Sequence, residues 1–572
     1  MHSIIFVLIR RLQLPLIVLI CINAISMLGF VLIPGTDDQG QAWRMDFFHA
    51  FYFVSFMGTT IGFGEIPFAF NDAQRLWATF TIYGTVIAWL YAIGSIFSLI
   101  QDPAFRALGT ENAFRRGVRR IKEPFYLVCG YGDTGSFLVR TLTETGIRSV
   151  VVDSKQNRLI ELETGGLPIH IPGICANASE PDVLLMAGLK NPTCAGVIAL
   201  TNDDHINLKI SITSKLLNPG LPVIARAETH DVEVNIASFG TENIINPFDT
   251  FAGRLALAVH SPGIYLLYEW MTGVPYEHLS EPLFLPHGTW VLCGYGRFGQ
   301  SVYDRLRREG VHTTVIEAKP EITGGLPEGA VIGRGTEAVT LEEANIRDAV
   351  GIIAGTDDDA NNLSIIMTAR QLNPKLFLIA RQNQRRNDAN FSAARLDLIM
   401  SRGNIIAHKI FALITVPVLG NFLAHARLQN NDWANELVSR ISGVIDDEAP
   451  HNWMIEVDQN DSPALLMGIV EGKKILVRHL LCDPRNRDNR LPCILLFIKR
   501  GELEILLPEE NAVLMEGDKI LMCGQYGVKR QVDWSIKNKN VFDYIYTGKE
   551  QSSGYLAQWV ARKNNKTKKP SR

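Results

Sequence analysis

Two long runs without a charged residue constrain this chain more than any other feature. The first extends from Leu12 to Pro34 and the second from Leu76 to Ile100. Each run reaches the ~20 residues that a helix needs to cross a hydrocarbon core of roughly 30 Å. A removable secretion signal is the alternative for the first run, but the run is long for such a signal and a second run follows it. We therefore predict two membrane spans, at about 12–34 and 76–100.

Basic residues flank both spans on the sides away from the intervening loop. The loop itself has only two basic residues, Arg44 and Arg75, against five acidic ones. Because positively charged flanks stay on the cytoplasmic side of a membrane, we expect both chain ends in the cytoplasm. The flanking residues are Arg10 and Arg11 before the first span and Arg106, Arg115, Arg116, Arg119, Arg120 and Lys122 after the second.

A third apolar segment lies between the spans but is too short to cross. It reads "DFFHAFYFVSFM", from Asp46 to Met57, and a glycine-containing stretch, "MGTTIGFGE", follows it up to Glu65. The segment fits a re-entrant helix at about 45–58. Non-helical backbone at membrane depth is tolerated only where protein buries it or where it lines a water-filled path. The glycine-containing stretch is such backbone.

The glycines of this stretch stand at alternate positions, Gly62 and Gly64. In a pore that replaces an ion's hydration shell, consecutive carbonyl groups point toward one axis, whereas an extended strand of L-residues alternates them. Glycine at alternate positions removes the obstacle because it adopts positive φ without a steric penalty. Thr60 adds a hydroxyl oxygen at the inner end.

The segment "TTIGFGE" resembles the TTVGYGD signature of potassium channels. The resemblance implies a filter over 60–64, with K⁺ held at Thr60, Ile61, Gly62 and Phe63 and the filter completed by Gly64. It also implies four chains around one pore, embedded in the lipid bilayer. Three residues depart from the signature, of which Ile61 in place of Val is a small change. Phe63 lacks the hydroxyl that bonds to the helix behind the filter, and Glu65 replaces Asp at the outer mouth.

The second span contains Gly84 and, ten residues later, Gly94. Glycine inside a helix costs about 1 kcal/mol relative to alanine, so a glycine there calls for a reason. Gly84 stands where the potassium channel family commonly has a gating hinge in its inner helix. Close packing between helices is the alternative, which we favour for Gly94 and leave open for Gly84.

From Pro124 onward the chain contains two copies of one domain. "YLVCGYGDTG", from Tyr126, returns as "WVLCGYGRFG", from Trp290, at an offset of 164 residues. "VIALTNDD", from Val197, returns as "IIAGTDDD", from Ile352, at an offset of 155. Repetition at a near-constant offset indicates duplication, with the second copy nine residues shorter in its middle part.

Each copy has the layout of a dinucleotide-binding unit, with an apolar strand, G-x-G-x-x-G opening a helix, and an acidic residue about 20 positions later. The glycines let backbone amides approach a phosphate at the positive end of the helix. The acidic residue, Asp153 in the first copy and Glu317 in the second, is suited to a ribose diol. The glycines are Gly130, Gly132 and Gly135 in the first copy and Gly294, Gly296 and Gly299 in the second.

This region resembles the RCK domain, also called the TrkA N-terminal domain, and residues 498–524 resemble the smaller TrkA C-terminal domain. With the pore, the resemblance covers nearly the whole chain. It implies a prokaryotic inner-membrane homotetramer whose RCK copies form a cytoplasmic gating ring. We expect a pore domain at 1–103, a linker at 104–123, RCK copies at 124–286 and 287–430, a TrkA-C-like α+β module at 431–540 and a basic tail at 541–572.

The ligand of these domains follows from the residues around the glycines. Some RCK domains bind calcium through carboxylates, but Arg226 and Arg381 take one such place here, and guanidinium suits phosphate better than a cation. A surface salt bridge is the alternative for both. We favour NAD or ADP/ATP and keep Ca²⁺ as a second candidate. The other expected binding residues are Asp133, Thr134, Thr201, Arg297, Phe298 and Thr356.

Composition narrows the function classes. A net charge of -3 argues against nucleic acid as a partner. Eight cysteines without a C-x-x-C pair argue against a structural zinc site. No constellation of nucleophile, base and substrate domain points to an enzyme. Two other readings stay open: a membrane-anchored NAD-dependent oxidoreductase, and a regulatory subunit of a separate potassium transporter.

Overall fold

The computed structural model describes residues 2–241, 243–274 and 278–549, and the chain divides into two compact units after Arg120. The side chains of residues 2–11 and 103–108 lie outside this description, and so do those of the flanking residues Arg10, Arg11 and Arg106. Each unit is described by itself.

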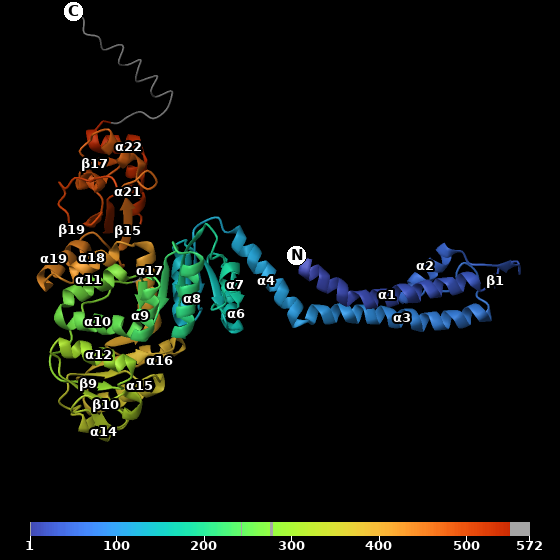
Figure 1. Cartoon of the computed structure of the whole chain (residues 1–572), viewed down its shortest axis with the longest axis horizontal. Helices are drawn as coiled ribbons and strands as arrows, with labels where there is room; N and C mark the ends of the chain where they lie inside the picture. Colours follow the sequence, from blue (N-terminus) through green and yellow to red (C-terminus); the bar gives the residue numbers. More distant parts are fainter. Residues whose placement is uncertain (1, 242, 275–277, 550–572) are drawn as a thin grey trace, which may run out of the picture. The chain divides into compact units, whose positions relative to one another are not determined.

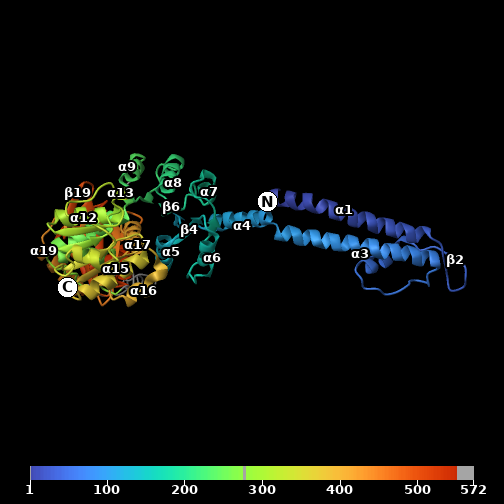
Figure 2. The same ribbon diagram turned by 90° about the horizontal axis from the view of Figure 1, so that it is seen from below.

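The first unit is a pair of long helices with a short one tucked against them (Figure 1). Helices α1 and α3 lie side by side in both views (Figure 2). Both are long and apolar enough to cross a membrane, over Leu12–Leu32 and Asp72–Gln101, so the two predicted spans are confirmed. The elements are α1 (His2–Leu32), β1 (Gly35–Thr36), β2 (Ala42–Trp43), α2 (Phe47–Gly58), α3 (Asp72–Gln101) and α4 (Pro103–Arg120).

Helix α2 is the short apolar helix that the sequence predicts between the spans. Asp46 caps it, with its carboxylate accepting the amide of His49 at 2.8 Å. Its buried face packs against α1 through aromatic rings, with Phe53 and Phe30 4.8 Å apart between centroids. Trp77 Nε1 of α3 donates to the carbonyl of Ser26 in α1 at 3.0 Å. These contacts place the end of α2 and the loop after it beside both long helices.

The first parallel sheet of the second unit has the order β5-β4-β3-β6-β7-β8. This is the doubly wound order, in which the chain reverses direction beside the first strand and leaves a crevice at the carboxyl ends of β3 and β6. Its central strands are buried on both faces and read as continuous apolar runs. The strands are β3 (Phe125–Cys129), β4 (Arg148–Asp153), β5 (Gly173–Cys175), β6 (Cys194–Ala199), β7 (Val223–Arg226) and β8 (Asn243–Ile245), and the helices are α5 (Asp133–Glu144), α6 (Gln156–Thr164), α7 (Pro181–Met186), α8 (Asp204–Leu217) and α9 (His230–Ser238).

The second sheet repeats the first, with the order β11-β10-β9-β12-β13-β14. The duplication and the Rossmann-like fold of both copies are therefore confirmed. Its strands are β9 (Trp290–Cys293), β10 (Thr313–Glu317), β11 (Val331–Ile332), β12 (Gly351–Ala354), β13 (Phe377–Gln382) and β14 (Leu398–Ser401), and its helices are α12 (Arg297–Arg308), α13 (Pro320–Thr323), α14 (Ala338–Glu343), α15 (Asp359–Leu372), the 3-10 turn η1 (Arg385–Asn387) and α16 (Asp388–Ala393).

The two copies exchange the helices that follow their last strands. Helix α10 (Pro247–His260) follows the first sheet but packs on α12 of the second, where Phe248 and Phe251 join the core around Phe298. Helix α17 (Arg402–Thr415) follows the second sheet but packs on α5 of the first, where Ile406 and Ile410 enter the core. Helix α11 (Pro262–Thr272) follows α10 and contacts α17, and it also packs on the two helices after α17, α18 (Leu419–Ala426) and α19 (Asn431–Ser442). Each copy's core is thus completed by the other.

An antiparallel sheet of order β15-β20-β18-β19 forms the last part of the described chain. It has its own core around Trp453, and the buried carboxylate of Asp518 pairs with Arg500 at 2.7 Å. The TrkA-C assignment itself stays a prediction. The elements are β15 (His451–Glu456), α20 (Pro463–Val470), η2 (Val477–Leu480), β16 (Cys482–Asp483), β17 (Asn486–Arg490), β18 (Cys493–Arg500), β19 (Leu503–Leu506), β20 (Lys519–Gly524), α21 (Val528–Lys537) and α22 (Lys539–Thr547). The basic tail expected at 541–572 lies outside the described residues from 550 onward.

Candidate functional site

The loop after α2 has positive φ at three alternate positions. Gly62 has φ of 67° and Gly64 of 98°, as predicted, and Thr60 also has φ of 60°. Alternation between positive and negative φ is the backbone pattern that turns successive carbonyl groups to one side. The positive φ of Thr60 is not predicted from its residue type, since a β-branched residue rarely adopts it.

One side of the expected filter segment is not covered by its own chain. Ile61 is 61% exposed and Phe63 is 65% exposed. A Cβ atom placed on Gly62 or on Gly64 meets no other atom within 4 Å. In a single chain the segment therefore lies open on a side that its own chain does not cover.

Phe63 and Glu65, two of the three departures from the filter signature, each have defined partners. The ring of Phe63 stacks parallel to Tyr52 at 6.5 Å between centroids and meets the edge of Phe56 at 5.5 Å. Glu65 accepts from Arg75 Nε at 2.9 Å and from the amide of Phe70 at 2.9 Å. Packing of rings thus takes the place of the hydroxyl contact behind the filter, and Glu65 ties the outer loop to the start of α3.

Helix α3 continues without a break through Gly84 and Gly94. A Cβ atom on Gly84 lies 3.4 Å from Ile22 Cγ2 of α1, whereas one on Gly94 meets nothing within 4 Å in this chain. Gly84 therefore faces the neighbouring span. Both the hinge and the packing interpretations of Gly84 stay predictions.

In the first RCK copy the glycines bring β3, the loop after β6 and α5 together. Gly130 has φ of 107°, and a Cβ atom there lies 2.9 Å from the carbonyl of Leu200. A Cβ atom on Gly135 lies 2.0 Å from the carbonyl oxygen of Gly130, so only glycine fits. Gly132 is the residue before α5. The carboxylate of Asp153 accepts the amides of Tyr131 at 2.7 Å and Lys155 at 2.8 Å.

The second copy partly covers the N-terminal end of α5 in the first, where the sequence predicts a phosphate site. Gly403, in the first turn of α17, lies so close to α5 that a Cβ atom would be 3.4 Å from the amide nitrogen of Thr134. The carboxylate of Asp133 accepts the amide of Arg385 at 3.2 Å. Arg158 pairs with Asp153 at 3.0 Å and lies over Gly132. Asp133 and Asp153, two residues expected to bind a ligand in the first copy, thus already have partners within the chain.

The second copy has an open cavity of about 660 Å³ at the corresponding place. Gly294 has φ of 94°. A Cβ atom on Gly299 lies 2.0 Å from the carbonyl oxygen of Gly294, as in the first copy. Glu317 accepts the amides of Tyr295 at 2.6 Å and Lys319 at 2.8 Å. The cavity is lined by residues that the sequence assigns to the ligand, namely Gly294, Gly296, Arg297, Phe298, Glu317, Thr356 and Arg381.

The exchanged helix α10 supplies one wall of this cavity. Phe248 packs against Phe298, and the guanidinium of Arg381 lies over both rings, at 5.1 Å and 5.5 Å from their centroids. Burial, together with the nearby guanidinium of Arg402, lowers the pKa of Arg381 to about 10. The Nε of Arg381 is buried without a hydrogen-bond partner among the described residues. An anion in the cavity would complete its bonding.

Comparison with known proteins follows this division of the chain. The ion channel family matches residues 17–102, and the TrkA-N domain family matches 126–247 and 290–402. Potassium channel protein 1 of Methanocaldococcus jannaschii is 27% identical over 259 residues, which is 45% of this chain and 72% of that protein. The chain belongs to the potassium channels with RCK domains. It spans less than two thirds of a second relative, probable potassium channel protein 2 of the same organism, at 24% identity over 38% of this chain and 63% of that one.

Solved structures of RCK channels are similar as well. The GsuK channel bound to NAD covers 94% of this chain and all of its own at 17% identity and a TM-score of 0.44. GsuK bound to ADP covers 72% of this chain and 99% of its own at 21% identity and a TM-score of 0.43. TM-scores of this size carry no conclusion on the site of this RCK channel.

A carboxylate that the sequence does not single out joins the two RCK copies. Glu228, in the loop after β7, is 8% exposed and pairs with Arg226, with Arg402 at 2.9 Å and with Arg297 at 3.0 Å. Burial would raise the pKa of Glu228, but these three guanidinium groups hold it below the ordinary value. Arg226 is thus engaged in an ion pair inside the protein. The signal in the sequence is the glutamate two residues after the arginine that ends β7.

Two buried asparagines hold the predicted threonines of the RCK channel. Asn207 accepts from the amide of Thr201 at 2.9 Å and donates to the carbonyl of Arg226 at 3.0 Å. Asn362 likewise accepts from the amide of Thr356 at 2.9 Å and donates to the carbonyl of Arg381 at 2.7 Å. In both copies the asparagine stands six residues after the threonine. This repeated spacing is a signal in the sequence that was missed.

The acidic turns after β6 and β12 bind backbone amides in the RCK channel. Asp204 accepts the amides of Glu228 and Thr229, and Asp359 accepts those of Asn383 and Gln384. Within the ranges that the structure describes, no group of three or more His, Cys, Asp and Glu side chains is placed to hold a metal ion.

Proposed function

We propose that this RCK channel is one of four subunits of a pore selective for K⁺, with NAD or an adenine nucleotide as its cytoplasmic effector. The observation that carries the proposal is the alternating positive φ at Thr60, Gly62 and Gly64. Backbone of this kind supplies carbonyl oxygens in place of an ion's hydration shell. The filter signature and the relative named a potassium channel support K⁺ as the ion.

Four-fold assembly is supported by the side of the filter segment that a single chain does not cover. One chain supplies one filter strand, whereas a carbonyl cage needs strands from several sides. The exposed sides of Ile61 and Phe63 are available to other copies. In this assembly, in a prokaryotic plasma membrane, the basic segment after α3 lies on the cytoplasmic side.

The second RCK copy is our choice for the occupied nucleotide site. The helix that begins at its glycine loop starts with Arg297, whereas the first copy has Asp133 at the same place. A phosphate at a helix N-terminus is stabilised by the positive end of the helix and further by a guanidinium, but it is repelled by a carboxylate. The cavity of the second copy and the covered first site agree with this choice. Calcium remains the second candidate effector.

Glu228 offers a route from the nucleotide to the rest of the channel. Arg297, which lines the second site, pairs with Glu228 of the first copy. A bound phosphate would compete for Arg297 and weaken this contact between the copies. Effectors shift a conformational equilibrium only by their difference in affinity between states, typically about 1–3 kcal/mol per site, and several sites add.

Recording from the purified full chain in a planar bilayer tests the proposal. We expect K⁺ current with reversal potentials that follow the K⁺ gradient rather than the Na⁺ gradient. Adding NAD, ADP, ATP or Ca²⁺ in turn to the cytoplasmic side identifies the effector by its change in open probability. Absence of current in the full chain under every effector would contradict the pore, and would favour a regulatory subunit. Hydride transfer from NADH to an added acceptor would favour the oxidoreductase.

A further inference from the structure

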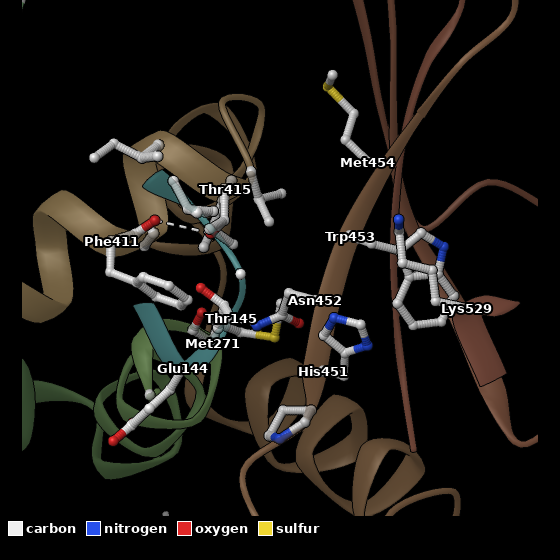
Figure 3. Close-up of a pocket in the computed structure, with 18 of the residues that line it drawn as sticks. Glu144, Thr145, Met271, Phe411, Thr415, His451, Asn452, Trp453, Met454 and Lys529 are labelled. Carbon is white, nitrogen blue, oxygen red and sulfur yellow. Dashed lines mark hydrogen bonds between the residues drawn. The ribbon is translucent and has the colours of Figure 1, made fainter. Parts of the chain in front are cut away.

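A second large cavity is lined by none of the glycines of the two glycine loops. It has a volume of about 720 Å³. Its walls come from the first RCK copy, at Tyr126 and Thr145, from the end of α17 at Phe411, and from β15 at His451 and Asn452 (Figure 3). Three parts of the second unit that are distant in sequence therefore meet around one space.

Three consecutive residues of β15 in this wall have buried polar atoms without partners. They are His451 Nδ1, Asn452 Oδ1 and Trp453 Nε1, and none of them has a hydrogen bond among the described residues. Trp453 is 2% exposed. Asn452 donates its Nδ2 to the carbonyl of Met271 at 2.9 Å, which leaves the Oδ1 as the free acceptor. Buried polar groups are nearly always bonded, so three in succession indicate a partner from outside the chain.

The surroundings of these atoms define the chemistry of that partner. His451 stacks parallel to Tyr526, with centroids 4.8 Å apart and planes 10° apart, and this pair offers a flat aromatic surface. Burial, together with Lys529, lowers the pKa of His451 to about 4, so its imidazole is neutral at pH 7. Figure 3 shows Phe411 and Met271 on the side of the cavity facing His451 and Asn452.

Charge argues against a phosphate-bearing occupant. Lys529 is the single lysine or arginine among the described residues that line the cavity. Its ammonium lies 3.6 Å from the carboxylate of Asp533 one helical turn away, so it is already paired. Neither of the glycine loops reaches this wall. The cavity is thus of a different kind from the nucleotide sites.

We infer that this cavity is a binding site for a neutral, flat aromatic molecule that presents an N–H donor to Asn452 Oδ1. Such a molecule stacks within reach of His451 and Tyr526 and bonds to His451 Nδ1 and Asn452 Oδ1, whereas Trp453 belongs to the core of the last module. Because it contacts the first RCK copy, α17 and β15 together, it stabilises one arrangement of these parts. The inference does not depend on which nucleotide the glycine loops bind.

Binding of 7-azaindole to the purified full chain tests the inference, with indene as its matched control. The two molecules share a flat bicyclic shape, but only 7-azaindole has an N–H donor. Calorimetry should show one 7-azaindole per chain with at least tenfold tighter binding than indene. Equal binding of the two compounds, or no binding of 7-azaindole, would overturn the inference.

Two variants locate the probe. Asn452→Leu removes the acceptor and should weaken 7-azaindole at least tenfold without changing indene, whereas Asn460→Leu, at an exposed turn of the same module, should leave both unchanged. His451→Phe keeps the stack on Tyr526 but removes the nitrogens, so it gives an independent reading if Asn452→Leu unfolds. If folded Asn452→Leu or folded His451→Phe binds 7-azaindole as tightly as the wild type does, the proposed site is wrong.

Competition separates this site from the glycine loops. Saturating ADP should leave 7-azaindole binding unchanged. Displacement of the probe by ADP would assign it to the nucleotide sites and overturn the inference. Because the measurement needs no current, its outcome is independent of whether the proposed pore conducts.

Discussion

Arg402 Nη1 lies 2.9 Å from Glu228 Oε1, and this contact joins the helix that follows the second sheet to the loop after β7 in the first. Arg226 and Arg297 approach the same carboxylate. One negative charge therefore holds three positive ones together at the junction of the RCK copies.

Replacing the shared carboxylate should destabilise the cytoplasmic unit. Glu228→Gln leaves buried guanidinium groups without their counter-charge, and breaking a buried ion pair from one side costs about 3–5 kcal/mol. The measurement is the unfolding free energy of the full chain in detergent, followed by tryptophan fluorescence. Glu502→Gln, at an exposed position, serves as the control and should change nothing. Equal stability of the two variants would show that the junction contributes no stability.

Acidification should remove the same stabilisation. The pKa of Glu228 in the folded chain lies below its ordinary value of 4.5, so its contribution is fully present above that value. It is lost as pH falls through the lower, folded pKa, because both states are then protonated. The difference in melting temperature between wild type and Glu228→Gln should therefore be constant from pH 7 to about pH 5 and shrink in more acidic buffer. A difference that grows on acidification would reverse the assigned sign.

Arg297 should matter for nucleotide affinity more than its counterpart in the first copy. We expect Arg297→Ala to weaken ADP binding about 10- to 100-fold, because a hydrogen bond to a charged group contributes roughly 1.5–3 kcal/mol. Asp133→Ala tests the equivalent position and should not weaken ADP binding. Calorimetry on the full chain measures both. A larger loss from Asp133→Ala would place the nucleotide in the first copy instead.

Phe63→Tyr should sharpen ion selection. The ring already packs between Tyr52 and Phe56, so an added hydroxyl lies at the edge of an aromatic cluster behind the filter. One new hydrogen bond contributes about 0.5–1.5 kcal/mol, equivalent to a two- to tenfold higher K⁺/Na⁺ permeability ratio if it favours the K⁺-sized cage. Reversal potentials under bi-ionic conditions measure the ratio. Ile61→Val is the control for a change of side-chain volume, and a fall in the ratio for Phe63→Tyr would contradict the expectation.

Several features could be read from the sequence because each depends on neighbouring residues. The charge-free runs predict α1 and α3, since span length follows from bilayer thickness. Positive φ at Gly62 and Gly64 follows from residue type. The duplicated glycine motifs predict two sheets of the same order, because the tight turns between strand and helix admit only glycine at Gly135 and Gly299.

Other features escaped the sequence because they join residues far apart along the chain. Glu228 and Arg402 are 174 positions apart, and no local pattern marks either as a partner of the other. Positive φ at Thr60 runs against its residue type and is imposed by the loop around it. Asn207 and Asn362 are local signals, but their role appears only when the ends of β7 and β13 lie beside them.

The amino-acid sequence alone determined the membrane spans, the conformation of the filter glycines and the duplicated Rossmann-like units, because local geometry and hydrophobic length settle each of these. The tertiary structure alone decided that α10 and α17 exchange places, that the first nucleotide site is covered while the second is open, and that His451, Asn452 and Phe411 border one cavity. The physical reason is that each of these depends on contacts between residues far apart along the chain, which local geometry does not set.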